Sequence, residues 1–333
     1  VYLGQGRFSG PRSIEINGQS LAFSKAVIAT GGRAWRPDIP GLEEAGFLTN
    51  ETVFSLTELP RRLAVLGAGP IGCELAQSFA RFGAEVHLLE VFDQILGKED
   101  REAADIVQQA LVDDGIELHL NCRTEEVQRS ATGRVLKLRS GDESVRELEV
   151  DEILVGAGRV PNVDGLNLEQ AGVEFDPKSG VLVDDRLQTT NPRIYAAGDI
   201  CSRFKFTHAA DAMARIVIQN SLFPKIIGRA KASSLLIPWC TYTQPEIAHV
   251  GLYEHEARER NVEHQVLVQQ LAQMDRAILE GETTGFVKVV ADRKGNILGA
   301  TIVAGHAGDL ISEITVAIRG GLKLSSLAST IHP

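Results

Sequence analysis

A glycine-rich turn between an apolar strand and a helix is the feature that most constrains the fold of this chain. Residues 62–66 predict a buried parallel strand, and they run directly into Gly67-Ala68-Gly69-Pro70-Ile71-Gly72. A helical pattern follows from Cys73, and a second strand is expected at 85–89, just before Glu90. This strand–turn–helix–strand order predicts a βαβ unit within a mainly parallel sheet.

Each glycine of this turn has a physical role if a dinucleotide binds there. Gly67 permits the tight turn, Gly69 removes a side chain that would block the pyrophosphate, and Gly72 lets the helix pack closely on the strand. The N–H groups at the helix start would hold the phosphates. Glu90 follows Gly67 by 23 residues, near the usual spacing for the acid that binds the adenosine ribose, and its charge repels a 2′-phosphate. We therefore expect NADH to be preferred over NADPH; the alternative is a βαβ unit that binds nothing.

Two stretches of the chain follow the same order, which indicates an internal duplication rather than two unrelated hairpins. Each has a hairpin, an apolar strand, a glycine–arginine segment, a proline and a similar tail. These parts are Asn17-Gly18, 26–29, 30–33, Pro37 and 41–46 in the first stretch, and Gly141, 153–155, 156–159, Pro161 and 165–172 in the second. If both are dinucleotide folds, the first glycine turn would lie about 60 residues before Val1, so we expect the start of the first domain to be missing.

A third segment completes the pattern. Residues 181–184 predict a strand, and a later stretch ends in Tyr195-Ala196-Ala197-Gly198-Asp199. With these parts in this order, the chain resembles, over essentially its whole length, the class I pyridine nucleotide–disulfide oxidoreductases, the family of dihydrolipoamide dehydrogenase, glutathione reductase and mercuric reductase. The residues that carry the resemblance are Ala29-Thr30-Gly31, 67–74, 156–162 and 195–199.

The resemblance implies an α/β fold with two dinucleotide-binding domains, each containing a three-stranded meander, and a C-terminal α+β dimerisation domain. The expected boundaries are 1–56 and 179–232 for the FAD-binding domain, 57–178 for the NAD-binding domain and 233–333 for a truncated dimerisation domain. A helix over 310–318, which contains Glu313, would lie at the interface of a homodimer in which two subunits build each active site.

The resemblance also implies FAD and NAD(H) as cofactors and assigns residues to them. The residues expected at the nicotinamide nucleotide are Gly67, Ala68, Gly69, Pro70, Ile71, Gly72, Cys73, Glu74, Glu90, Val127 and Gly158. Those expected at the flavin are Ala29, Thr30, Gly31, Arg159, Gly198, Asp199, Thr207, His208 and Ala209. Thr207 and His208 would open a helix whose positive end faces the flavin pyrimidine. Glu74 matches the family's acid beside the nicotinamide and is a candidate catalytic residue.

His332 is the second candidate catalytic residue. In the family a histidine near the C-terminus, followed by Pro-Thr, moves a proton to and from a thiol. His332-Pro333 matches its first two residues, but it also matches a variant in which an aromatic residue takes the catalytic place, and a solvated histidine near the end of the chain is an equal alternative. The sequences at 5–8, 50–54 and 331–333 resemble those of mercuric-reductase-like members, which favours the variant with an aromatic residue in the catalytic place.

The cysteines depart from the family pattern. The redox-active pair, four residues apart, is absent, because Cys73, Cys122, Cys201 and Cys240 lie far apart. We expect the pair to belong to a missing N-terminal segment, through which electrons would pass from NADH and FAD to a disulfide, lipoamide or Hg(II). The alternatives are a flavoprotein reductase or transhydrogenase without redox cysteines, or an inactive fragment that only binds nucleotide and dimerises. We expect the 333-residue chain alone to have little or no activity.

Composition excludes several other classes of function. The net charge of −10 disfavours nucleic acids and anionic membranes as partners, and no apolar run is long enough to span a bilayer. The four separated cysteines favour reduced thiols and a cytoplasmic location. The eight histidines are scattered without ligand spacing, so we expect no metal site.

Overall fold

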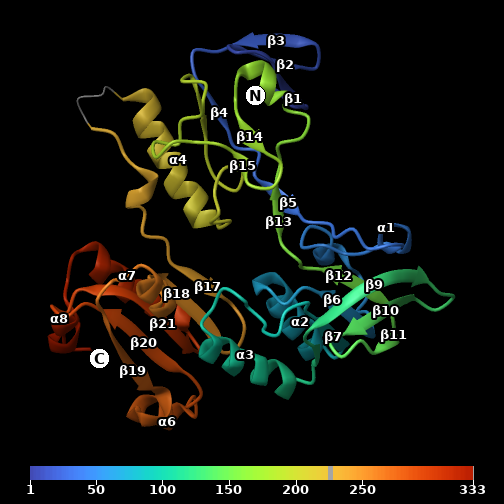
Figure 1. The fold of residues 1–333 in the computed structure, drawn as a ribbon, viewed down its shortest axis with the longest axis vertical. Coiled ribbons are helices and arrows are strands. Elements are labelled where there is room, and N and C mark those ends of the chain that lie inside the picture. The colour runs from blue at the N-terminus through green and yellow to red at the C-terminus, as the bar shows by residue number, and fades with distance from the viewer. Residues whose placement is uncertain (224–227, 333) are drawn as a thin grey trace. The chain divides into compact units, whose positions relative to one another are not determined.

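The computed structural model describes residues 1–223 and 228–332, which form two compact units (Figure 1). The first consists of Val1–Trp35 and Arg159–Leu235, and the second of Arg36–Gly158 and Leu236–Pro333. These divisions differ from the boundaries expected at 56/57 and 178/179. The difference arises because residues 36–56 pack with the second unit and residues 159–178 pack with the first.

The second unit begins with the predicted βαβ arrangement. Its four-stranded parallel sheet has the order β12-β6-β7-β8. The strands and the helices between them are β6 (Arg62–Leu66), α2 (Pro70–Phe82), β7 (Glu85–Leu89), α3 (Arg101–Asp113), β8 (Glu117–His119) and β12 (Glu152–Val155). The strands predicted at 62–66 and 85–89 are thus confirmed. The inner strand β6 begins with the partly buried Arg62, and its four remaining residues, Leu63 to Leu66, are apolar and buried, as expected where both faces of a parallel sheet are covered.

The layout of the two repeats is the same in the structure. Each begins with a three-stranded antiparallel meander and continues into a strand that joins a parallel pair or sheet. The first repeat contains β1 (Gly6–Gly10), β2 (Ser13–Ile16), β3 (Gln19–Ala22) and β4 (Ala26–Ile28); the second contains β9 (Cys122–Arg129), β10 (Arg134–Ser140), β11 (Val145–Val150) and β12. Asn17 and Gly18 both have positive φ, as the predicted hairpin turn requires.

The Gly-Arg segments of the repeats pair with each other. In β5 (Gly32–Ala34) and β13 (Arg159–Pro161) the strands run antiparallel. The tail after each segment then packs against the meander of the other repeat. Thus α1 (Leu42–Ala45) joins the core beneath β9 and β10, and the short 3₁₀ helix η2 (Leu168–Ala171) joins the core beneath β1.

The rest of the first unit is short strands and one long helix. They are β14 (Phe175–Asp176), β15 (Gly180–Val181), β16 (Ile194–Ala196) and α4 (Thr207–Leu222), with a 3₁₀ turn at Ala232–Ser234. The strand predicted over 181–184 is wrong in extent, because β15 ends at Val181. The carboxylate of Asp184 instead accepts the N–H groups of Arg186 and Gln188 in a turn.

The C-terminal part of the second unit is a five-stranded antiparallel sheet of order β17-β18-β21-β20-β19. Its elements are β17 (Trp239–Thr241), β18 (Glu246–Gly251), α5 (Glu254–Glu259), β19 (Gln265–Gln270), a 3₁₀ turn (Leu271–Gln273), α6 (Asp275–Glu280), β20 (Phe286–Ala291), β21 (Ile297–Ala304), α7 (Ala307–Arg319) and α8 (Leu324–Ser329). Another 3₁₀ turn, Val53–Ser55, precedes β6 in the same unit. The helix predicted at 310–318 is therefore present within α7.

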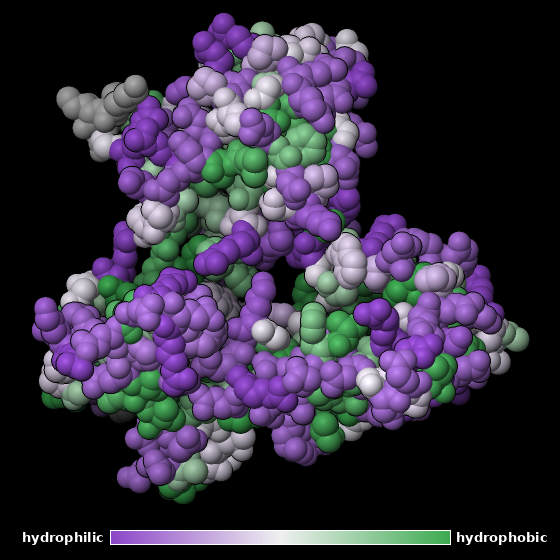
Figure 2. All heavy atoms as spheres, in the orientation of Figure 1, coloured by the Kyte–Doolittle hydropathy of each residue, from purple (hydrophilic) through white to green (hydrophobic). Residues whose placement is uncertain are grey.

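The surface agrees with the composition. The face shown in Figure 2 is mostly hydrophilic, with hydrophobic residues in smaller areas between. Within the described residues, none of the helices combines the length and the apolar character that crossing a bilayer demands.

Candidate nucleotide sites

The glycine turn between β6 and α2 has the geometry of a dinucleotide cradle. Gly67 has a φ of +99°, which favours glycine, and a Cβ there would lie 2.8 Å from the Cα of Ala157. A Cβ on Gly72 would lie 1.9 Å from the carbonyl oxygen of Gly67, so helix and turn are in direct backbone contact. A Cβ on Gly69 would meet nothing within 4 Å. Pro70 occupies the first turn of α2, where its missing N–H costs no hydrogen bond. The residues therefore fit a pyrophosphate approaching at Gly69.

Glu90 lies at the carboxyl end of β7 and contacts this turn directly. Its Oε2 accepts the N–H of Ala68 at 2.8 Å, and its Oε1 accepts the N–H of Val91 at 2.8 Å. The backbone between them is also tied, since the N–H of Gly67 donates to the carbonyl oxygen of Leu89. The carboxylate is thus oriented at the edge of the turn, where the sequence placed a ribose-binding acid.

Cys73 and Glu74 lie near the start of α2 but have different surroundings. The Cys73 side chain is fully buried, and burial raises the pKa of its thiol. Glu74 Oε1 accepts the backbone N–H of Tyr242 at 2.8 Å, and burial raises the pKa of this carboxyl although that hydrogen bond opposes the shift. Glu74, Tyr242 and His306 line a polar cavity of about 340 Å³.

The other expected nicotinamide-nucleotide residues differ in their access to a ligand. Gly158 has a φ of +120° and open space on the side where a Cβ would project. Val127 is buried among apolar side chains, and its backbone N–H donates to the carbonyl oxygen of Pro40. Its side chain therefore serves the core beneath the β9–β11 meander.

The expected flavin residues of the first unit gather at the carboxyl ends of two neighbouring strands. Strands β4 and β16 are parallel, so 29–31 and 197–199 leave the same edge. The first of these turns is fastened to Asn162: Thr30 Oγ1 donates to its carbonyl oxygen at 3.0 Å, and its side-chain amide donates to the carbonyl oxygen of Thr30 at 2.9 Å. Gly31 accepts the backbone N–H of Asn162.

Arg159 and Asp199 form an ion pair at this edge. Arg159 Nε lies 3.2 Å from Asp199 Oδ2, and Arg159 Nη2 donates to the carbonyl oxygen of Gly32 at 2.7 Å. Gly198 has a φ of +85°, which lets the chain turn just before the carboxylate. The structure therefore places together two residues that are 40 positions apart in the sequence.

Helix α4 begins where the sequence placed it, at Thr207. Thr207 and His208 are exposed, whereas Ala209 is buried. The His208 ring stacks on that of Phe206 with ring centroids 5.4 Å apart. Only the first two of these three expected flavin residues therefore have side chains accessible to a ligand.

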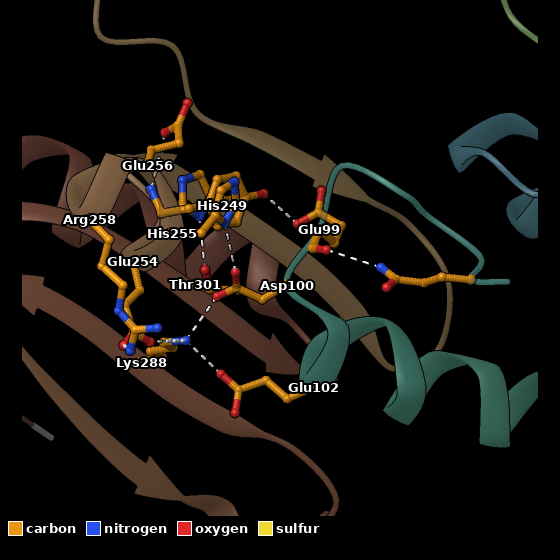
Figure 3. Close-up of polar contacts among 12 residues, drawn as sticks. Glu99, Asp100, Glu102, His249, Glu254, His255, Glu256, Arg258, Lys288 and Thr301 are labelled. Carbon is orange, nitrogen blue, oxygen red and sulfur yellow. Dashed lines mark hydrogen bonds and ion pairs between the residues drawn. The ribbon is translucent and has the colours of Figure 1, made fainter. Parts of the chain in front are cut away.

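A polar network that the sequence did not indicate joins the segment before α3 to the C-terminal sheet (Figure 3). Glu99, buried, accepts the hydroxyl of Tyr253 at 2.6 Å and the indole N–H of Trp239 at 3.0 Å. Burial raises the pKa of Glu99, against the effect of both hydrogen bonds. No pattern in the sequence indicates this network, because Glu99 lies more than 100 residues from Trp239 and Tyr253 along the chain.

Lys288 is the cationic centre of the same network. Its Nζ lies 2.9 Å from Asp100, 2.6 Å from Glu102 and 3.1 Å from Glu254, and it is 6% exposed. Burial alone would lower the pKa of Lys288, but the three carboxylates raise it above its ordinary value. The ammonium group therefore stays charged and binds α3 and α5 to β20.

The structure places His332 beside α7. Its Nε2 lies 2.8 Å from Glu313 Oε1, and both side chains are about half exposed. The hydrogen bond that His332 donates to Glu313 raises the pKa of this imidazole. Pro333, the other residue of the expected pair, lies outside the described residues.

None of the four cysteines is placed as a reactive thiolate. Burial raises the pKa of each thiol, for Cys201 to about 12. A thiol needs a lowered pKa to act as a nucleophile near neutral pH.

Known proteins resemble this chain in sequence and in fold. It is 35% identical over 331 residues to a mercuric reductase from Bacillus cereus, covering 99% of the chain and 52% of that enzyme. It is 34% identical to a dihydrolipoyl dehydrogenase from Thermus scotoductus, covering 99% of the chain and 71% of that enzyme. The solved structure of the HOCl-induced flavoprotein disulfide reductase RclA from Escherichia coli matches 99% of the chain, and 75% of its own, at 30% identity with a TM-score of 0.89. The chain thus spans about half the length of the Bacillus mercuric reductase.

Family models match both parts of the chain. Residues 1–214 match the pyridine nucleotide-disulphide oxidoreductase model, and residues 237–333 match the dimerisation domain of the same family. The fold class predicted from the sequence is confirmed. Members of the family are FAD-dependent enzymes that use NAD(P)H, in agreement with the cofactors expected from the sequence. This chain belongs to the pyridine nucleotide-disulphide oxidoreductase family.

Proposed function

We propose that this protein is an FAD-dependent oxidoreductase that takes its electrons from NADH. The observation that carries the proposal is the turn before α2, where Gly69 leaves open space at the helix start and Glu90 is fixed at its edge. The helix dipole and the N–H groups there favour a pyrophosphate. Bound FAD would supply two-electron chemistry between the nicotinamide and an acceptor.

Discrimination between the two nicotinamide nucleotides rests on Glu90. A carboxylate held by the N–H groups of Ala68 and Val91 is oriented, so it can accept hydrogen bonds from ribose hydroxyls. The same charge would repel a 2′-phosphate. The residues that follow it, Val91, Phe92 and Asp93, supply no cation to offset that repulsion.

The flavin would be held by the edge formed by β4 and β16. Thr30 and Gly31, kept in place by Asn162, would contact it from one strand end, and Asp199, oriented by Arg159, from the other. The start of α4 would supply Thr207 and His208. From the order of the sequence motifs, rather than from the compact units, we assign 1–56 and 179–232 to an FAD-binding domain, 57–178 to an NAD-binding domain and 233–333 to the dimerisation domain.

Glu74 would act beside the nicotinamide, and partial burial raises the pKa of its carboxyl. Dimerisation would cover part of α7, where Leu310 and Val316 are exposed apolar residues next to the His332–Glu313 pair. We infer a homodimer in the cytoplasm. The acceptor would be a disulfide or Hg(II), because the sequence relatives include both dihydrolipoyl dehydrogenases and mercuric reductases.

The test is an anaerobic titration of the protein produced from its intact gene. If NADH reduces the bound flavin and a long-wavelength charge-transfer band then appears in the spectrum, the result would support a thiolate beside the flavin and a disulfide mechanism. Reduction of the flavin without that band would contradict the disulfide mechanism and favour a reductase or transhydrogenase that lacks redox cysteines. Absence of bound flavin would contradict the proposal itself.

A variant separates nucleotide choice from overall integrity. Glu90→Gln removes the charge but keeps one acceptor, so we expect KM for NADH to rise about tenfold. KM for NADPH should fall or stay unchanged. Glu126→Gln, at a partly exposed position in β9 of the same unit, is the matched control and should leave both constants unchanged.

A further inference from the structure

The outer edge of the parallel sheet carries three side chains that the nucleotide site does not use. His87 lies on β7, and Glu117 and His119 lie on the neighbouring edge strand β8. The register pairs His87 with Glu117 and Leu89 with His119. Because side chains two apart in a strand project to the same face, all three lie on one side of the sheet. The linear spacing of the histidines gave no sign of this, since 32 residues separate the two.

The potential ligand atoms of this cluster are close together. His87 Nδ1 lies 3.2 Å from His119 Nε2. Oε2 of Glu117 lies 3.3 Å from His87 Nδ1, and the other oxygen, Oε1, lies 3.4 Å from His119 Nε2. Zn²⁺ binds such ligands at about 2.0–2.1 Å, so the corners of its tetrahedron are about 3.3 Å apart. The two ring nitrogens are therefore as far apart as two ligands of a tetrahedral ion, and each oxygen of Glu117 lies at about that distance from one of them. With one ligand atom from each side chain, all three atoms lie within 4.8 Å of one another.

The contact between His87 and Glu85 is also of the kind that a metal-ligating histidine makes through its second ring nitrogen. Its second ring nitrogen, Nε2, lies 3.3 Å from Glu85 Oε1. A carboxylate that accepts the remaining N–H of a ligating histidine fixes the ring and strengthens the metal–nitrogen bond. Both histidine side chains are buried, whereas the carboxylates of Glu85 and Glu117 are more than half exposed, which leaves a path for an ion from solvent.

We propose that His87, Glu117 and His119 form a binding site for a divalent first-row metal ion of the Zn²⁺ class. His87 Nδ1, His119 Nε2 and one carboxylate oxygen of Glu117 are the protein ligands, and water completes the tetrahedron. The ion would join the edge strand β8 to β7 at three side chains. Among the residues that the structure describes, this is the one group of three such side chains with mutually close ligand atoms.

Without metal, a chain of hydrogen bonds accounts for the same side chains. Arg146 donates to His119 Nδ1, whose Nε2–H then points to His87 Nδ1, and His87 Nε2–H points to Glu85. Metal binding at His119 Nε2 moves the proton of that ring to Nδ1, which can no longer accept from Arg146. Arg146, about half exposed, must therefore swing away as the ion enters. The guanidinium competes with the metal.

This competition gives the proposal a sharp test, in which Zn²⁺ binding to the 333-residue protein is measured by calorimetry and Co²⁺ binding by visible absorbance. The wild-type protein should bind one ion, and Co²⁺ should give the intense absorption of a tetrahedral complex. His119→Gln should abolish this. Glu85→Gln should weaken Zn²⁺ binding by about 10–100-fold. Arg146→Gln should strengthen it, by up to about tenfold, because it removes the competing donor and a nearby positive charge.

His264→Gln, in the C-terminal part of the chain, is the control and should bind Zn²⁺ as the wild-type protein does. Glu85 and Arg146 have exposed side chains, so their variants decide the question even if His119→Gln does not fold. The proposal is overturned if the wild-type protein binds no Zn²⁺. It is also overturned if Glu85→Gln and Arg146→Gln bind it as the control does, which would leave the cluster as a metal-free hydrogen-bond chain.

Discussion

Gly72 packs directly on the turn that begins its own motif, since a Cβ at Gly72 would lie 1.9 Å from the carbonyl oxygen of Gly67. The contact is between two backbones, so no side chain can rotate to relieve it. Gly69, three residues earlier, has nothing within 4 Å on the corresponding side. Two glycines of one turn are thus required for different reasons, one for packing and one for ligand access.

This difference predicts opposite effects for two alanine variants. Gly72→Ala should destabilise the protein by about 1–3 kcal/mol, because turn and helix must separate. Gly69→Ala should leave stability within about 0.5 kcal/mol of wild type but weaken NADH binding at least several-fold. Thermal unfolding and a fluorescence titration with NADH measure the two effects. Equal loss of stability in both variants would contradict the assignment of Gly69 to ligand access.

Lys288 should be among the most sensitive charged positions of the second unit. Lys288→Met keeps the volume of the side chain but leaves Asp100, Glu102 and Glu254 without their shared cation. We expect a loss of about 3 kcal/mol in the free energy of unfolding, measured with urea. Lys294→Met, at an exposed position in the turn after β20, is the control and should change little. A loss below about 1 kcal/mol at Lys288 would show that the network is solvated.

The His332–Glu313 pair predicts a pH dependence with a definite sign. Because the hydrogen bond donated to Glu313 raises the pKa of His332, the folded protein holds this proton more tightly than the unfolded chain. The stabilisation is fully present below the ordinary histidine pKa of 6.5 and is lost as pH rises through the raised value. An NMR titration of the His332 ring should show a midpoint above 6.5, which Glu313→Gln returns to the ordinary value. A midpoint unchanged by Glu313→Gln would mean that the two side chains do not pair in solution.

The four thiols should react slowly in the folded protein. A thiol-specific disulfide reagent attacks thiolates, and burial keeps all four cysteines protonated near neutral pH. We expect little labelling of the native 333-residue chain and labelling of all four cysteines in denaturant. Rapid labelling of Cys201 or Cys240, the two that are only partly buried, would assign one of them a chemical role.

The sequence by itself determined the parts of this protein that depend on local backbone demands. The positive φ at Gly67 and the close backbone contact at Gly72 each require glycine, and the hairpin turn requires residues such as Asn17 and Gly18 that tolerate positive φ. These features could therefore be recognised from the order and spacing of residue types. The shared layout of the two repeats was visible for the same reason. The extent of the strand at 181–184 was not, because the turn held by Asp184 competes with it.

Only the tertiary structure decided which distant residues meet. The pairing of Arg159 with Asp199 and of Lys288 with Asp100 depends on the register of strands and on the packing of separate elements. The crossed tails, in which α1 and η2 each complete the core of the other repeat, also follow from packing alone. The His87–His119 contact has the same origin, since only the parallel alignment of β7 and β8 places two buried rings side by side.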